Sequence, residues 1–69
     1  MKLPRRLVRQ ADIEAAAAEY VRWRGVTGAR NVARELRTFW SRRNDAGRAT
    51  VQRRILAAID ALARSRTVH

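Results

Sequence analysis

Residues 28–47 read GARNVARELRTFWSRRNDAG, and this stretch decides the fold because it holds one amphipathic helix and the turn that ends it. Its apolar residues recur at spacings of three and four, which places them on one face of a helix. They are Ala29, Val32, Ala33, Leu36, Phe39 and Trp40. Thr27 stands where an N-cap residue is expected, and the residues from Asn44 to Gly47 favour a turn. The stretch therefore predicts a helix over residues 28–43.

One further helix is predicted on each side of this stretch. Residues 11–24 and residues 48–64 also repeat their apolar positions every three or four residues, and no segment alternates as a strand does. The predicted core positions of these two helices are Ile13, Ala16, Ala17, Tyr20, Val51, Ile55, Ala58, Ile59 and Leu62. Gly25 follows the first helix where a left-handed C-terminal cap would fall. The sequence thus predicts an all-α fold of three helices.

We expect these helices to form a single domain over residues 11–64. A basic arm at residues 1–10 precedes it, and a frayed tail at residues 65–69 follows it. A domain of about 60 residues buries only about 60% of the surface of its unfolded chain, so a homodimer is expected to complete the core. The side chains assigned to a dimer or partner contact are Leu56, Leu62, Trp23 and Trp40.

Composition excludes several classes of function. The 69-residue chain carries 16 Lys or Arg against 6 Asp or Glu, a formal net charge of +10, and it has no Cys. Its single histidine is His69. With one histidine and no cysteine, the chain cannot build a thiol-and-imidazole metal cage, a disulfide framework or a Cys nucleophile. No glycine-rich phosphate loop or nucleophile elbow appears, so we expect neither catalysis nor a cofactor. The longest apolar run, residues 15–18, is far shorter than the roughly 20 residues of a membrane span, so a cytoplasmic protein is expected.

Positive charge is concentrated in the arm and in the last two predicted helices, while the first helix is close to neutral. The arm contributes Lys2, Arg5, Arg6 and Arg9. The middle helix contributes Arg30, Arg34, Arg37, Arg42 and Arg43, of which the first three form a stripe. The planar fork of arginine donates paired hydrogen bonds to phosphate, so these side chains are candidate phosphate contacts. A solvated face in an arginine-rich protein is the plainer alternative.

Residues 47–54 read GRATVQRR and open the last predicted helix with the side-chain types that contact base edges and phosphates. Together with packing positions at Ala33 and Leu36, they make Val32–Ile59 resemble a helix-turn-helix DNA-binding segment. The resemblance implies that the second helix of the pair enters the major groove. The groove contacts would be Arg48, Thr50, Gln52 and Arg53. A helical hairpin without a groove-reading element is the alternative arrangement.

These features predict a small nucleic-acid-binding protein that prefers duplex DNA to RNA. Transcriptional regulation or accessory DNA binding on the nucleoid of a bacterium, or in a phage or mobile element, is the expected role. The alternative is a protein-binding modulator that inhibits or recruits an acidic host protein, with Trp23, Phe39 or Trp40 as anchors. Stacking of Trp23 on single-stranded bases and a membrane-surface helix are less favoured interpretations.

Overall fold

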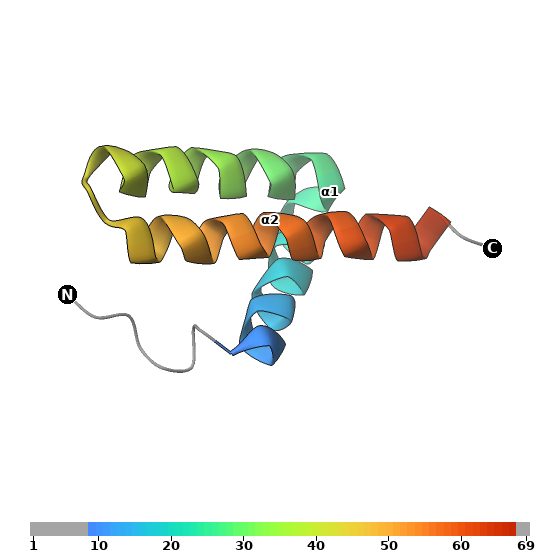
Figure 1. The fold of residues 1–69 in the computed structure, drawn as a ribbon. Helices are drawn as coiled ribbons and strands as arrows, with labels where there is room; N and C mark the ends of the chain where they lie inside the picture. The colour runs from blue at the N-terminus through green and yellow to red at the C-terminus, as the bar shows by residue number, and fades with distance from the viewer. Residues whose placement is uncertain (1–8, 68–69) are drawn as a thin grey trace.

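The computed structural model describes residues 9–67, and these residues form two helices and no strand (Figure 1). Helix α1 spans Gln10–Arg42, and helix α2 spans Ala46–Thr67. The all-α fold is confirmed, but the predicted count of three helices is wrong. Helix α1 contains both of the first two predicted helices and bends between them at Gly25. Helix α2 also continues through residues 65–67, which were expected to fray.

The kink in α1 depends on two glycines. Gly25 has φ 71° and ψ 175°, a backbone region that is essentially restricted to glycine. Its φ is positive, as a C-terminal cap requires, but the chain resumes a helix at once, so Thr27 lies inside α1 and caps nothing. Gly28 then passes close to the preceding turn, where an added Cβ would lie 2.7 Å from the Cβ of Arg24. The bend sends residues 10–24 across α2 while the rest of α1 runs alongside it (Figure 1).

The turn between the helices is a tight C-terminal cap followed directly by an N-cap. The Asp45 amide donates to the Trp40 carbonyl oxygen at 2.9 Å and the Asn44 amide donates to that of Ser41 at 3.1 Å, the paired bonds of a Schellman motif. Asn44 takes the positive φ of 57° that this motif requires. Asp45 then caps α2, because its Oδ1 accepts a hydrogen bond from the Arg48 amide at 3.0 Å. The predicted turn residue Gly47 therefore lies inside α2, which begins two residues before the predicted start.

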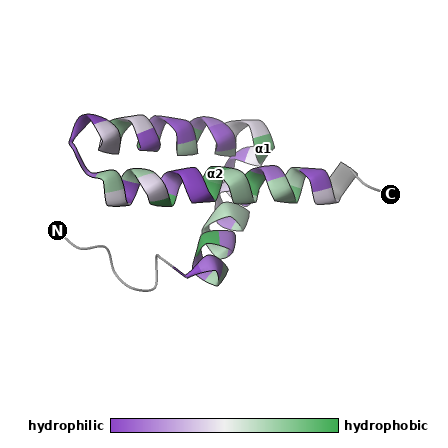
Figure 2. Ribbon diagram, viewed as in Figure 1, coloured by the Kyte–Doolittle hydropathy of each residue, from purple (hydrophilic) through white to green (hydrophobic). Residues whose placement is uncertain are grey.

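The core lies where both parts of α1, the first part at residues 10–24 and the second part at residues 26–42, meet α2. Each of the three segments contributes small or branched side chains at spacings of three and four, as the sequence predicts. The buried apolar residues are Ile13, Ala17, Val21, Ala29, Ala33, Ala49, Val51, Ile55, Ala58 and Ile59. Five of these ten are alanines, which allow the helix backbones to approach closely but bury little area each. Figure 2 shows hydrophobic residues along α2 and the first part of α1, and mostly hydrophilic ones along the second part.

Neither helix of the described chain is long and apolar enough to cross a membrane.

Candidate nucleic-acid interface

Residues 26–42 of α1 and helix α2 form an antiparallel hairpin (Figure 1). Near the turn, the Cζ atom of Arg48 lies 4.5 Å from the centroid of the Trp40 ring. Farther from the turn, Arg30 Nε donates to Asp60 Oδ1 at 2.7 Å and forms an ion pair with it. These two contacts give the approximate register of the two helices, to within about two residues.

The register brings two arginines to the same level on one face of the hairpin. Residues seven apart share a face of a helix because seven residues make nearly two turns. Seven residues after Arg30 comes Arg37, and seven residues before Asp60 comes Arg53. This spacing predicts that Arg37 and Arg53 face one another as Arg30 and Asp60 do, with two positive charges in place of an ion pair.

Among the described residues, the arginines at this level of the hairpin have no ion pair with a carboxylate. Arg34 lies on the same stripe of α1 between Arg30 and Arg37, and we refer to Arg34, Arg37 and Arg53 as the hairpin arginine cluster. Arg34 and Arg53 are exposed and Arg37 is half-buried, and none of the three forms an ion pair with another described residue. A cluster of unpaired guanidinium groups raises the local positive potential and favours an anion at its centre.

Acidic residues are scarce across the whole turn half of the hairpin. Residues 34–54 contain seven arginines but only two acids, Glu35 and Asp45. Asp45 is engaged, since it caps α2 and lies 3.4 Å from Arg48 Nη1. The remaining acids of the chain lie elsewhere, three of them in residues 10–24 and one in the Arg30 pair.

Two arginines at the turn stack on aromatic rings. The Cζ atom of Arg43 lies 3.7 Å from the centroid of Phe39, whose ring meets Trp40 edge-on at 4.8 Å, and Arg48 covers Trp40. A guanidinium held flat on a ring keeps its N–H donors available at the edge, so Arg43 is positioned before any ligand arrives. Sequence analysis missed this stack, although the spacing of four between Phe39 and Arg43 was a usable signal.

A hollow of about 440 Å³ lies beside the stack on α1. Four of its six lining side chains can donate a hydrogen bond, one supplies an aromatic ring, and the sixth is a carboxylate. The lining residues are Arg34, Glu35, Thr38, Phe39, Arg42 and Arg43. Three guanidinium groups against one carboxylate keep the hollow positive.

Two of the α2 residues predicted to contact DNA are engaged within the protein. Gln52 accepts a hydrogen bond from the Tyr20 hydroxyl at 3.3 Å, and Arg48 is held between Trp40 and Asp45. Thr50 is exposed on α2. The resemblance to a helix-turn-helix segment stays a prediction.

The residues predicted for partner contact fall into different environments. Leu56 and Leu62 are half-buried and pack against the core. Trp40 is half-buried within the aromatic stack, whereas Trp23 is 77% exposed at the rim of a hollow of about 290 Å³. Of the arm residues, Arg9 directly precedes α1, and the other three lie outside the described residues.

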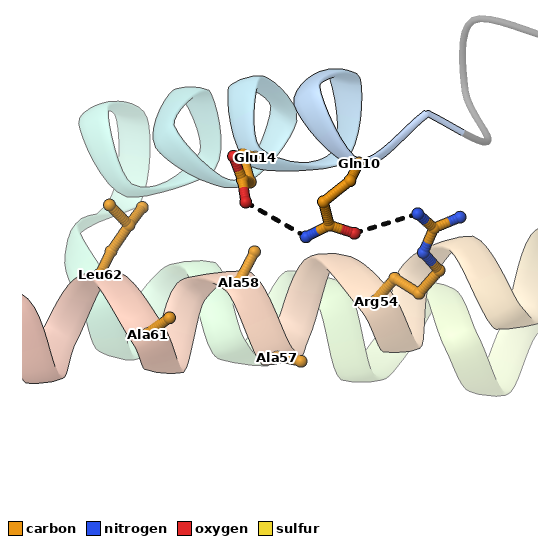
Figure 3. A pocket seen from close by; sticks show the side chains of 7 residues that line it. All are labelled: Gln10, Glu14, Arg54, Ala57, Ala58, Ala61 and Leu62. Carbon is orange, nitrogen blue, oxygen red and sulfur yellow. Dashed lines mark hydrogen bonds between the residues drawn. The ribbon is translucent and has the colours of Figure 1, made fainter.

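A further hollow of about 380 Å³ lies between the first part of α1 and α2 (Figure 3). Leu62 and three alanines of α2 line its apolar side, and polar side chains line the other. Those polar groups bind one another, since Arg54 Nη2 donates to Gln10 Oε1 at 3.0 Å and Gln10 Nε2 donates to Glu14 Oε2 at 3.3 Å. Their mutual bonding makes this hollow a poor match for a charged ligand. The described residues contain no group of side chains able to hold a metal ion.

Comparison with models of known protein families gives no match, and comparisons with curated proteins and with solved structures give none either.

Proposed function

We propose that the chain binds nucleic acid through the turn half of the hairpin and that duplex DNA is its preferred ligand. The observation that carries this proposal is the register set by the Arg30–Asp60 ion pair, from which we infer that Arg37 and Arg53 form a like-charged pair two turns nearer the hairpin turn. Two facing guanidinium groups can share one phosphate diester, which relieves their repulsion and supplies the missing anion. Regulation of transcription or accessory DNA binding on the bacterial nucleoid, or in a phage or mobile element, is the role that we propose with it.

Phosphate contacts from this surface would dominate the affinity. The proposed contacts are the Arg37–Arg53 pair on one phosphate, Arg42, Arg43 and Arg9, with the other arm residues as additions. Each phosphate contact on B-DNA contributes about −0.9 to the slope of log affinity against log salt concentration. Roughly four phosphates therefore predict that affinity falls by about 100-fold between about 50 and 200 mM salt.

A salt titration on a random-sequence duplex tests the proposal, with two double variants that remove the same charge. Arg37→Gln/Arg53→Gln removes the facing pair, and Arg22→Gln/Arg24→Gln removes two exposed arginines of the first part of α1. Because the pair shares one phosphate, we expect the first variant to reduce the slope by about 0.9 and the second to change it much less. Equal changes would mean that only net charge matters, and absence of binding at low salt would refute the proposal.

A second candidate function rests on Trp23. Trp23 is 77% exposed, so it does not serve the core. Exposed aromatic side chains of this kind are enriched as anchors at protein interfaces. The chain would then act as a modulator that docks on an acidic host protein, with its charge steering the encounter. Trp23→Ala should abolish such binding and leave DNA affinity unchanged.

We also propose a homodimer, with the apolar side of the hollow in Figure 3 as the contact. Leu62 and the exposed Ala57 and Ala61 lie there, so a second copy would bury them. Sedimentation of the protein alone tests this, and a folded monomer at high concentration would contradict it.

A further inference from the structure

We infer that residues 26–42 of α1, and not α2, enter the major groove, with Asn31, Arg34 and Thr38 facing the base edges. This inference rests on the proposed DNA binding and names the element that reads the sequence. A major groove about 12 Å wide admits one α-helix, so only one helix of the hairpin can occupy it.

Helix α2 has few side chains left for reading bases. Gln52 is bonded to Tyr20, and Arg48 is stacked and ion-paired at the turn. Another side of α2 faces the first part of α1, where Arg54 is bonded to Gln10 (Figure 3). Among the exposed residues of α2 from 46 to 61, only Thr50 and Arg53 are polar.

The outer face of residues 26–42 carries the side chains that α2 lacks. Asn31, Arg34 and Thr38 are spaced by three and four, so they share one face, and all three are exposed. This face lies on the side of the helix away from the buried Ala29 and Ala33. Asparagine pairs with adenine, arginine with guanine, and the threonine methyl group contacts the thymine methyl group. Figure 1 shows this segment along one edge of the molecule, with α2 beside it on one side only.

Arginines flank the outer face on both sides, as a helix between two phosphate strands requires. On the side toward α2 lies Arg37, and Arg53 of α2 is inferred to face it. On the other side lies Phe39, with Arg43 stacked on its ring and Arg42 in the same hollow, where these two arginines outnumber the exposed Glu35. Phosphate contacts from both flanks would fix the depth and register of the helix while its outer face reads the bases.

The same geometry favours DNA over RNA. The major groove of A-form RNA is deep and too narrow for side chains to read. A helix that binds with its outer face inside the groove therefore needs B-form DNA. Duplex RNA of the same sequence should compete only through its phosphates.

The test begins with selection of preferred sites from a random duplex library by the full chain. Affinities for the selected duplex and for a scrambled one are then measured for two matched variants, Thr38→Ala on α1 and Thr50→Ala on α2. Both threonines are exposed and lie within helices, so both variants are expected to fold. Arg34→Gln is the third variant, and duplex RNA of the selected sequence is the competitor.

We expect Thr38→Ala to reduce the preference for the selected duplex several-fold and Arg34→Gln to reduce it by roughly 5- to 150-fold. Thr50→Ala should leave the preference unchanged, and duplex RNA should compete poorly. Loss of preference in Thr50→Ala but not in Thr38→Ala would overturn the inference, as would equal competition by RNA. Failure to select any preferred site would also overturn it, while salt-dependent binding to random duplexes would still uphold the proposed function. No binding at any salt concentration would overturn both.

Discussion

Replacing Gly25 by alanine should destabilise the protein, although the added methyl group meets nothing. The φ of 71° and ψ of 175° at Gly25 lie in a region that costs an L-residue about 1–3 kcal/mol. No heavy atom lies within 4 Å of the added Cβ, so this backbone cost stands alone. For a domain of this size, each kcal/mol lowers Tm by about 4–8 °C. We therefore expect Gly25→Ala to lower the free energy of unfolding by about 1–3 kcal/mol and Tm by at least about 4 °C.

The sign of the effect makes this a decisive test of the kink. If α1 were one straight helix, alanine would stabilise it by roughly 0.5–1 kcal/mol relative to glycine. Urea unfolding followed by far-UV circular dichroism measures the difference. Gly47→Ala is the matched control, because Gly47 is exposed in the first turn of α2 without a positive φ, and it should match or exceed the wild-type stability. A Gly25→Ala variant as stable as the wild type would refute the kinked architecture.

Three further perturbations test other parts of the structure. Asp45→Ala should cost about 0.5–2 kcal/mol by removing the cap of α2, and Asp45→Asn should recover most of that loss in urea unfolding. The side chains of Arg30 and Asp60 are 37% and 39% exposed, so a double-mutant cycle should give a coupling below about 1 kcal/mol; a coupling above about 2 kcal/mol would contradict this. Arg53→Glu should place a carboxylate opposite Arg37, raising Tm while weakening DNA binding, and a lower Tm would show that the two positions are not adjacent.

Helix faces were the part of the fold that periodicity could predict. Ile13 and Ala17 in α1, and Ile55 and Ile59 in α2, were assigned to the core and are buried. The pattern repeats every three or four residues over a length of helix, so it survives errors in where each helix begins and ends. Helix ends were less predictable. Gly47 is typical of a turn, but it lies within α2 because Asp45 caps this helix two residues earlier.

The kink and the candidate site could not be read from spacing. A glycine between two amphipathic stretches is compatible with a loop, a cap or a bend, and only packing of the flanking segments selects among them. The arginines of the site come from two helices, and the register of the hairpin decides which of them face one another. That register depends on contacts such as Arg30 with Asp60, thirty residues apart in the sequence, for which local periodicity holds no information.

The kink at Gly25 connects the stability of the fold to its charge distribution. It directs residues 10–24 across α2, where Ile13, Ala17 and Val21 reach the core. The same residues hold three of the six acids of the chain, and they cover a side of α2 different from the one that presents Arg53. Packing that buries the core thus also keeps the acids of residues 10–24 away from the hairpin arginine cluster. The folded state brings these like charges together, so a polyanion that binds this face more tightly than it binds the unfolded chain should stabilise the fold.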